Sequence, residues 1–239
     1  MKTRLDVELA RRGLATSRSQ AENAIRLGQV EVDGRVATKA GQPVQSDSAI
    51  RLLSTEQYVS RAGLKLASVA SGFKVEFQGK VVLDVGSSTG GFTDYALQHG
   101  AERVIAVDVG TDQLHPSLRA DERVELYEKT DIRDFQTDQP IDIIVCDVSF
   151  ISLREILPHV ARALMGSQTV LLAMVKPQFE AGKGQVNKGV IKNDKIRRQI
   201  LAGFEEWARN YFIVQDKRDS DVAGQKGNVE RFYVLKKAK

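Results

Sequence analysis

Short apolar runs alternate with amphipathic stretches along most of the chain, from Val59 onward. The apolar runs are rich in β-branched residues and have the length of buried strands: Lys80–Val85, Arg103–Val109, Val124–Lys129, Ile141–Cys146 and Val170–Val175. Stretches with helical spacing lie before, between and after them: Ser60–Gly72, Thr93–His99, Leu153–Met165 and Lys192–Arg209. This alternation predicts an α/β fold with helices on both faces of a mostly parallel sheet. Two last runs, Tyr211–Gln215 and Arg231–Lys236, predict a terminal pair of strands.

The first 58 residues follow another pattern, typical of a small α+β module. One short helix is predicted with Leu5 and Leu9 on one face, and a second over Arg18–Leu27 with Ser17 as its N-cap. Short strands are predicted at Val30–Gly34, Val44 and Ala49–Leu53. We therefore expect a small domain over residues 1–58 and a larger one over residues 59–239.

Composition narrows the class of protein. The chain has 239 residues, of which 42% are hydrophobic and one is a cysteine, Cys146. A lone cysteine forms no intrachain disulfide and favours a reducing compartment. No apolar run approaches the roughly 20 residues that span a bilayer, and the N-terminus has no apolar signal segment. We expect a cytoplasmic protein without a membrane span. The net charge of +4 permits nucleic-acid binding but does not indicate it.

In the segment Val82–Phe92, the first predicted strand of the larger domain runs into a glycine-rich loop, with glycines at 86, 90 and 91, and then into a helix. Glycines let a backbone turn sharply and approach a ligand closely. The order G-x-x-x-G-G is not the G-x-G-x-x-G of dinucleotide sites, and the Gly-Lys-Ser/Thr of a phosphate-binding loop is missing. Asp84 would repel a pyrophosphate but suits a ligand with an ammonium or sulfonium group. The spacing therefore favours S-adenosylmethionine.

Two further acids follow the next strands. Asp108 lies where a carboxylate can accept both hydroxyls of a ribose, and Asp131 could meet an adenine ring beside Ile132. Either acid could instead be a helix cap or turn residue. The residues expected to bind the cofactor are Asp84, Gly86, Ser87, Gly90, Gly91, Phe92, Asp108, Val109, Asp131, Ile132 and Asp147.

Two lysines and two acids form a candidate catalytic set: Lys65, Asp147, Lys176 and Glu230. Asp147 and Lys176 follow neighbouring predicted strands, which places both beside the cofactor loop. The alternative interpretation is that all four are surface salt bridges, as isolated lysines usually are.

The whole chain resembles the TlyA-type haemolysin/ribosomal RNA methyltransferase family. The resemblance is carried by the cofactor loop, by Cys146–Phe150 and Val175–Glu180, and in the small domain by Arg4–Asp6, Ser17–Ala21 and Gly28–Gly34. Such proteins join an S4-like RNA-binding domain to an FtsJ-like domain. The resemblance implies a Rossmann-like class I methyltransferase sheet and S-adenosylmethionine-dependent methylation of a ribose 2′-hydroxyl in ribosomal RNA, with cytidine as the expected nucleotide.

The family's Lys-Asp-Lys-Glu tetrad falls on Lys65, Asp147, Lys176 and Glu230. We expect Lys176 to lie nearest the 2′-hydroxyl and Lys65 to stabilise the developing alkoxide, while the two acids orient the amines. An ordinary lysine is mostly protonated at neutral pH, so desolvation and a second cation would be needed to free its amine. No metal is expected, because the 3 histidines are scattered and Cys146 is alone.

Two basic segments are candidate RNA contacts, with ribosomal RNA or ribosomal subunits as the expected partner. Their residues are Arg4, Arg11, Arg12, Ser17, Arg18, Gln20 and Arg26 in the small domain, and Lys183 and Lys188 in the larger one. Nearby acids offset these arginines, so they could instead solvate two helices, but the resemblance to the S4 domain favours RNA contact. Phe92 and Phe150 could stack on a base or simply pack. The sequence does not indicate an oligomeric state.

Other functions remain open from the sequence. The enzyme could methylate a base nitrogen or a small molecule, although such a nitrogen seldom needs a lysine base. The chain could also be a non-enzymatic RNA-binding factor. The haemolysin label implies membrane lysis, but no apolar or amphipathic spanning segment supports it.

Overall fold

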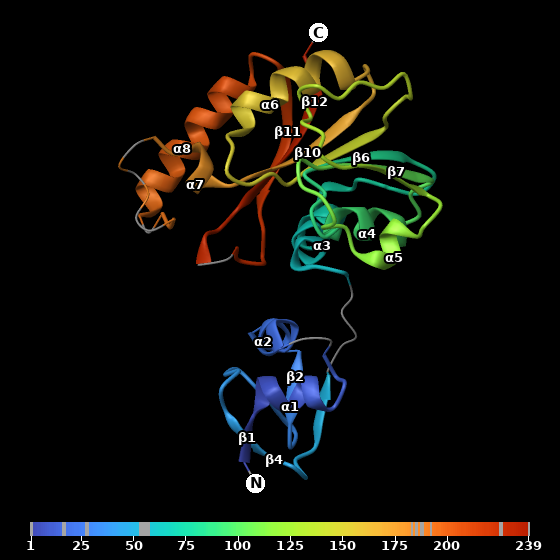
Figure 1. Cartoon of the computed structure of the whole chain (residues 1–239). Coiled ribbons are helices and arrows are strands. Elements are labelled where there is room, and N and C mark those ends of the chain that lie inside the picture. Colours follow the sequence, from blue (N-terminus) through green and yellow to red (C-terminus); the bar gives the residue numbers. More distant parts are fainter. Residues whose placement is uncertain are drawn as a thin grey trace. The chain divides into compact units, whose positions relative to one another are not determined.

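A computed structural model describes residues 2–15, 18–26, 29–52, 58–182, 184, 186, 189–191, 193–224 and 227–238, without the side chains of residues 19, 20, 23 and 26. The chain divides into two compact units, Met1–Gln57 and Tyr58–Lys239 (Figure 1). Each unit has its own hydrophobic core.

The N-terminal unit packs two helices against short antiparallel strands. Its elements are β1 (Lys2–Arg4), α1 (Leu5–Arg11), α2 (Arg18–Arg26), β2 (Val30–Val32), β3 (Arg35–Val36), β4 (Pro43–Gln45) and β5 (Ile50–Leu52). β1 pairs with β4, and β2 lies between β3 and β5. Leu5 and Leu9 share the predicted helix face, and both are fully buried against Ile25 and Val30. The predicted α+β module is confirmed.

The C-terminal unit is built on one seven-stranded sheet. Its elements are α3 (Arg61–Phe73), β6 (Val81–Val85), α4 (Gly91–Gln98), β7 (Arg103–Val107), α5 (Pro116–Arg119), β8 (Val124–Tyr127), β9 (Ile143–Cys146), α6 (Leu153–His159), the π-helix η1 (Val160–Leu164), β10 (Val170–Val175), α7 (Pro177–Glu180), α8 (Asp194–Ala208), β11 (Phe212–Asp219) and β12 (Arg231–Lys237). The strand order is β11-β12-β10-β9-β6-β7-β8. β12 pairs antiparallel with both β10 and β11, whereas the other described pairings of this sheet are parallel, so the predicted mostly parallel α/β sheet is confirmed.

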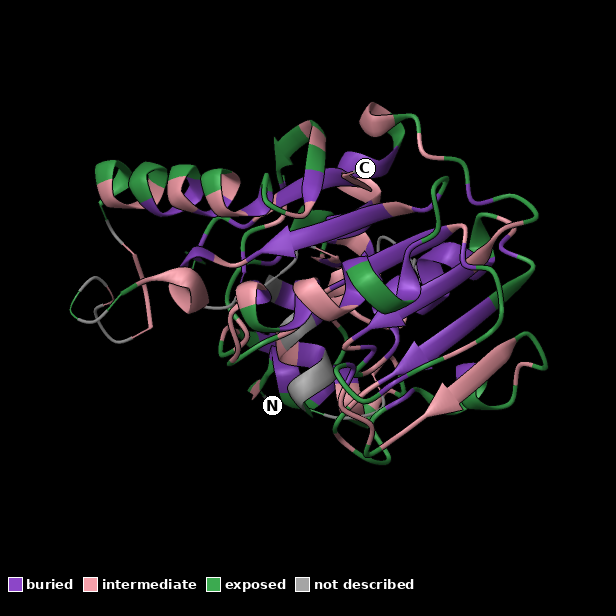
Figure 2. Ribbon diagram, turned by 90° about the horizontal axis from the view of Figure 1, so that it is seen from above, coloured by how far each residue is buried: buried purple, intermediate pink, exposed green. Residues whose placement is uncertain are grey.

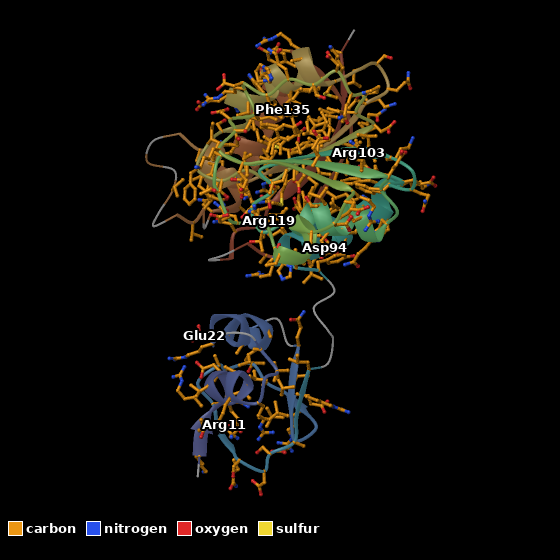
Figure 3. All side chains as sticks on the ribbon, turned by 45° about the vertical axis from the view of Figure 1, so that its right-hand side comes forward. Arg11, Glu22, Asp94, Arg103, Arg119 and Phe135 are labelled. Carbon is orange, nitrogen blue, oxygen red and sulfur yellow. The ribbon has the colours of Figure 1, made fainter. Side chains whose placement is uncertain are left out.

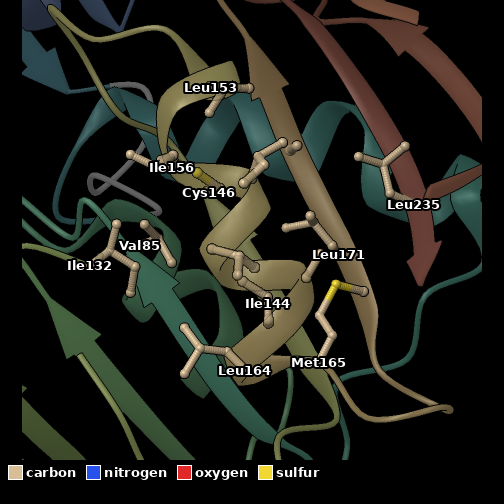
Figure 4. Close-up of a cluster of buried hydrophobic side chains, with 14 of the residues drawn as sticks. Val85, Ile132, Ile144, Cys146, Leu153, Ile156, Leu164, Met165, Leu171 and Leu235 are labelled. Carbon is tan, nitrogen blue, oxygen red and sulfur yellow. The ribbon is translucent and has the colours of Figure 1, made fainter. Parts of the chain in front are cut away.

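Side chains of successive strand residues pack into two cores, one on each face of the sheet. Leu83, Val85, Ile144 and Leu171 pack with α6, η1 and α8, and Figure 4 shows Val85, Ile144 and Leu171 beside Leu153, Ile156 and Leu164. The strand residues that alternate with these, such as Val82 and Val145, pack with α3, α4 and α5 on the other face. Figure 1 shows the same division, with α6 and α8 on one side of the sheet and α3, α4 and α5 on the other. Burial on both faces explains why interior strands read as continuous apolar runs, and they are the buried strands in Figure 2.

The direction in which strands are added reverses at β6. The chain places β7 and β8 on one side of β6, and then β9 and β10 on the other. In open α/β sheets, a crevice for ligands forms at such a reversal, outside the carboxyl ends of the strands. The glycine-rich loop follows β6 and therefore lies at this crevice.

One predicted helix is interrupted. The stretch Leu153–Met165 forms α6 and then the five-residue π-helix η1, with Pro158 inside α6. Proline has no backbone N–H, and its ring crowds the preceding turn. The next turn is wider, and Met165 N donates to Val160 O at 3.1 Å. Apolar spacing alone does not register this change of helix type.

The edges of the structure differ most from prediction. β11 extends to Asp219, well past the predicted end at Gln215, and its register against β12 shifts between Val214 and Asp216. The added residues are polar and mostly exposed because β11 is an edge strand, so no hydrophobic alternation marks them. The pattern also misses β1, β3, α5 and α7, each four residues or shorter.

We expect Gly63→Ala in α3 to lower the free energy of unfolding by about 1–3 kcal/mol, because overpacking forces its neighbours apart. A Cβ at Gly63 would lie 2.5 Å from Tyr58 Cβ and 2.9 Å from the backbone oxygen of Gly91. The measurement is urea unfolding followed by the fluorescence of Trp207, the one tryptophan of the chain.

Gly203→Ala in α8 is the matched control. Its Cβ would be 3.5 Å from Arg154 Nη2, an ordinary contact, so the gain in helix propensity should stabilise the unit by up to about 1 kcal/mol. Equal effects of the two substitutions would contradict the tight α3–α4 contact.

Candidate active site

The loop after β6 packs directly against the loop after β9. Gly86 has a positive φ of 80°, and a Cβ there would lie 3.0 Å from the backbone oxygen of Asp147. Gly90 has φ 96°, and its Cβ would overlap Leu114 and Leu118. Both positions therefore require glycine, for conformation and for space.

Asp84 is enclosed beneath this loop. Its Oδ2 accepts hydrogen bonds from Thr93 N at 2.9 Å and Thr93 Oγ1 at 2.7 Å. Among the described residues, its Oδ1 has no hydrogen-bond partner. Burial raises the pKa of Asp84 to about 7, and the nearby charge of Asp147 adds to the rise. Asp84 is thus a carboxylate that a cationic ligand would favour in its ionised form.

Two cavities meet at the carboxyl ends of the strands. The larger, about 350 Å³, is lined by residues that follow β6, β7, β8 and β9. The smaller, about 120 Å³, is lined by Asp84, Phe92 and Lys176 among others. Gly86, Ser88, Asp147 and Ser149 line both. The arrangement gives a two-part site, with one part large enough for a nucleoside and one part beside the lysine.

The larger cavity contains the acids predicted after β7 and β8. Asp108 accepts hydrogen bonds from Ser88 N at 2.8 Å and Gly110 N at 2.6 Å, which fix its carboxylate in the cavity wall. Val109, predicted inside a strand, lies past the end of β7 and is exposed beside the cavity. The predicted cofactor residues Gly86, Asp108, Val109, Asp131, Ile132 and Asp147 all line this cavity.

Asp131 is already bound by an arginine. Arg133 donates to its carboxylate through Nη2 at 2.6 Å and Nε at 3.0 Å, and these bonds lower the pKa of Asp131 to about 2. A carboxylate has about four acceptor sites, so a further donor can still bind. Asp131 is therefore both a turn residue, as the alternative interpretation had it, and a wall of the cavity.

The four tetrad residues form two ion pairs at one edge of the sheet. Lys176 Nζ lies 2.5 Å from Asp147 Oδ1 and donates to Ser149 Oγ at 2.7 Å. Lys65 Nζ, from α3, lies 2.5 Å from Glu230 Oε2. Val175, the last residue of β10, pairs with Arg231, the first residue of β12. Lys176 and Glu230, the next residues beyond this pair, therefore stand opposite each other. Each amine, nearly closed to solvent, has one carboxylate as its partner.

The two phenylalanines have opposite environments. Phe92 is buried and packs against Phe232 with 5.9 Å between ring centroids, so it is a packing residue that also lines the smaller cavity. Phe150 is 91% exposed at the mouth of the larger cavity, with a φ of 67°. A positive φ and an exposed ring are both unusual for phenylalanine. Phe150 is available to a ligand, and Phe92 is not available for base stacking.

Glu180 was not assigned a role from the sequence, although the Val175–Glu180 motif ends on it. Its carboxylate accepts hydrogen bonds from Ser152 Oγ at 2.6 Å and Leu153 N at 2.7 Å, at the start of α6. Burial raises its pKa. Through these bonds the segment after β10, with Lys176, is tied to the segment after β9, with Asp147. In the sequence, the only indication of this role of Glu180 is its membership of the Val175–Glu180 motif.

The predicted RNA contacts are partly covered by the structure. Arg4, Arg11, Arg12 and Arg18 of the N-terminal unit all form ion pairs with acids of that unit. Ser17, Lys183 and Lys188, and the side chains of Gln20 and Arg26, lie outside the described residues. Within the described ranges, no cluster of three histidine, cysteine or acidic side chains could hold a metal ion. No helix in the described part of the chain is long and apolar enough to cross a membrane.

Comparison with known proteins gives two family matches. Residues 58–238 match the FtsJ-like methyltransferase model, and residues 3–50 match the S4 domain model. The chain is 39% identical to the 16S/23S rRNA (cytidine-2′-O)-methyltransferase TlyA of Mycobacterium tuberculosis, over 98% of this chain and 90% of that protein.

Solved structures agree in fold. A Streptococcus thermophilus structure that carries the hemolysin name is 36% identical and superposes with a TM-score of 0.77, covering 100% of this chain and 89% of that one. An S-adenosylmethionine dependent methyltransferase from Mesorhizobium loti, only 12% identical, shares the fold with a TM-score of 0.53, over 74% of this chain and 100% of that one.

We expect Glu180→Ala to lower the free energy of unfolding by about 1–3 kcal/mol, because Ser152 Oγ and Leu153 N lose their acceptor in a buried place. Glu180→Gln is the control, since its amide can still accept from Leu153 N and donate to Ser152 Oγ; a change under about 1 kcal/mol is expected. Urea unfolding followed by Trp207 fluorescence measures both. An equal loss in the two variants would show that the acceptor is not what matters.

Proposed function

Because the chain belongs to the FtsJ-like methyltransferase family and carries an S4 domain near its N-terminus, we propose that it transfers a methyl group from S-adenosylmethionine to a ribose 2′-hydroxyl of ribosomal RNA. The observation that carries the proposal is the pair of lysine–carboxylate ion pairs beside the two-part cavity. A 2′-hydroxyl is a poor acid and needs a positioned base, which these amines supply. The name of the mycobacterial relative makes cytidine the expected nucleotide.

The cavities fit S-adenosylmethionine. The larger cavity has the volume and the acidic and apolar walls that suit an adenosine, with Asp108 for the ribose hydroxyls and Asp131 and Ile132 for the adenine. The smaller has Asp84 Oδ1, which lacks a hydrogen-bond partner in the described part of the chain, for the ammonium group, and the backbone of Gly86 also lines this cavity. When bound, this donor supplies a methyl group on a positively charged sulfur, which makes the methyl carbon electrophilic.

The remaining cofactor predictions have distinct parts in this proposal. Ser87 is buried, and its Oγ has no hydrogen-bond partner among the described residues, so it can bind a polar ligand group. Gly90 and Gly91 shape the loop, and a Cβ at Gly91 would lie only 2.8 Å from Gly63 N. Phe92 supplies an apolar wall.

Lys176 is the proposed base. Once Nζ has lost its own proton to solvent, it takes up the proton of the 2′-hydroxyl, and Asp147, 2.5 Å from Nζ, stabilises the ammonium that results. Ser149 Oγ holds the amine from a second direction. Glu230, which stands opposite Lys176, orients Lys65 from α3, and Lys65 stabilises negative charge on the attacking oxygen. Phe150, exposed at the cavity mouth, offers its ring to the base of the target nucleotide.

We expect Lys176→Ala to lower methyl transfer at least about 100-fold, the usual contribution of a positioned base, while donor affinity changes by less than about threefold. Transfer of a tritiated methyl group to ribosomal subunits measures the rate, and mass mapping of nucleosides identifies the 2′-O-methyl product. Lys217→Ala is the control, because Lys217 forms an exposed ion pair with Glu205 away from the tetrad. Full activity of Lys176→Ala would remove Lys176 from the mechanism.

Donor binding should strengthen as pH rises through about 7, because Asp84 must be ionised to attract the donor's positive charge and is protonated below its raised pKa. For one linked proton, affinity should change up to about tenfold per pH unit below pH 7. Calorimetry at pH 6 in two buffers of different ionisation heat should detect release of one proton.

Asp84→Asn is the control for this linkage. It should lose the pH dependence except for the titration of the donor's own amino group, and should bind more weakly at pH 8. An unchanged pH profile in Asp84→Asn would exclude Asp84 as the titrating group.

A further inference from the structure

The N-terminal unit closes two carboxylates to solvent, Asp6 and Glu8, both in the first turn of α1. Acids are rarely buried unless they are paired. Here the covering groups are arginines rather than apolar side chains, so the two acids lie beneath a layer of cations. The proposed function gives these acids no part.

Asp6 binds two arginines from different elements. Arg4 forms a fork on it, with Nε 3.0 Å from Oδ1 and Nη2 2.8 Å from Oδ2. Arg18, at the start of α2, donates its Nε to Oδ2 at 2.9 Å. The backbone N–H of Val7 donates to Oδ1 at 2.9 Å. Asp6 therefore fixes both guanidinium groups in one place.

Glu8 binds the next two arginines, Arg11 and Arg12, which differ in their other contacts and in their exposure. Arg11 forms a fork on it, with Nε and Nη2 at 2.8 and 2.6 Å, and Arg12 donates its Nε at 2.7 Å. Arg12 also donates to the backbone oxygens of Ser48 and Ser46 at 2.8 and 2.9 Å, and its side chain is 23% exposed. Arg12 is thus largely used in holding the 45–48 turn, whereas Arg11 remains at the surface.

The other three guanidinium groups keep an outward edge. Arg4, Arg11 and Arg18 have side chains 50–62% exposed, and Figure 3 labels Arg11 on this unit. A guanidinium has five N–H donors in a fixed plane. Arg4 and Arg11 bind their acids through Nε and Nη2, and within the described ranges their Nη1 atoms have no hydrogen-bond partner, so Nη1 can donate to another acceptor. A held guanidinium loses less side-chain entropy when it binds a phosphate.

The acids stay ionised under these cations. The guanidinium of Arg4 holds the pKa of Asp6 well below its usual range, and Arg11 and Arg12 lower the pKa of Glu8 to about 2. Each acid is therefore a permanent anchor at physiological pH.

We propose that Asp6 and Glu8 are positioning residues for RNA binding: each holds an arginine by one edge so that the opposite edge meets a phosphate of the RNA backbone, with Arg4 and Arg18 on Asp6 and Arg11 on Glu8. This inference rests on the proposed function for its RNA partner. It assigns Arg12 to the fold and the other three arginines to the interface.

The direction in which one substitution changes RNA affinity distinguishes a positioning role from an effect of net charge. If only net charge matters, removing an acid strengthens RNA binding and steepens its salt dependence. If Asp6 positions two arginines, Asp6→Asn weakens binding even though the protein becomes more positive.

The experiment uses the full chain and two RNA probes, ribosomal subunits and a fluorescent single-stranded RNA. We expect Asp6→Asn to bind RNA about tenfold more weakly. The slope of log Kd against log salt concentration should fall by about the value that one phosphate contact contributes. In methyl transfer, KM for subunits should rise while kcat is unchanged. Glu22→Gln, at a residue labelled in Figure 3, is the matched control: it removes the same charge, but Glu22 is more exposed and its Oε1 is 3.8 Å from Arg18 Nη2. It should bind as tightly as the unmodified chain or more tightly.

Thermal unfolding and limited proteolysis of the full-length Asp6→Asn variant show whether its residues 1–57 still fold. If it does not, the double variant Arg4→Lys/Arg18→Lys decides, because it keeps the charge and loses the forks; a similar loss of affinity is expected. Equal or tighter RNA binding by a folded Asp6→Asn, or by the lysine variant, overturns the inference and leaves the proposed function intact. If the unmodified chain neither binds nor methylates RNA, the proposed function itself fails.

Discussion

An ionised side chain at the end of a buried strand costs several kcal/mol unless an opposite charge meets it, and the active-site edge depends on this constraint. In the C-terminal unit, Asp147 and Lys176 directly follow the interior strands β9 and β10, and Glu230 directly precedes the antiparallel strand β12. Each charge is met by a partner: Asp147 by Lys176, and Glu230 by Lys65. The pairing that makes these charges tolerable also keeps the amines in place. The N-terminal unit uses the same solution at its surface, where Asp6 and Glu8 are closed in by arginines.

The fold was predictable wherever burial is two-sided or a glycine is required. Interior strands such as Ile143–Cys146 are apolar throughout because helices cover both their faces, and the sequence shows this directly. The second half of β11 is polar because it lies at the sheet edge, so its pairing with β12 leaves no mark in the sequence. Likewise, the change from α6 to η1 follows a single proline in an otherwise helical pattern.

The candidate site was predictable as a set of residue types, and less so as contacts. Asp84 is recognisable near the end of β6, and Asp108 and Lys176 directly after β7 and β10, because strand ends share one edge of a parallel sheet. Which acid meets which amine depends on the register of β10 against β12, and no local pattern encodes it. Glu180 acts through bonds to Ser152 and Leu153, far away in sequence. For the same reason the sequence could not separate Arg12, held by backbone oxygens, from the exposed Arg11.

The pairing of Lys65 with Glu230 has a consequence for biosynthesis. Glu230 is held by a strand that inserts between β10 and β11, so this ion pair closes only after nearly the whole sheet has assembled. Contacts between such distant segments are slow to form, whereas the S4 domain is complete within the first 57 residues. Domains generally fold in order as they leave the ribosome, the N-terminal one first. A growing chain therefore completes its S4 domain well before it can close the Lys65–Glu230 ion pair, so under the proposed function RNA binding would precede the capacity for methyl transfer.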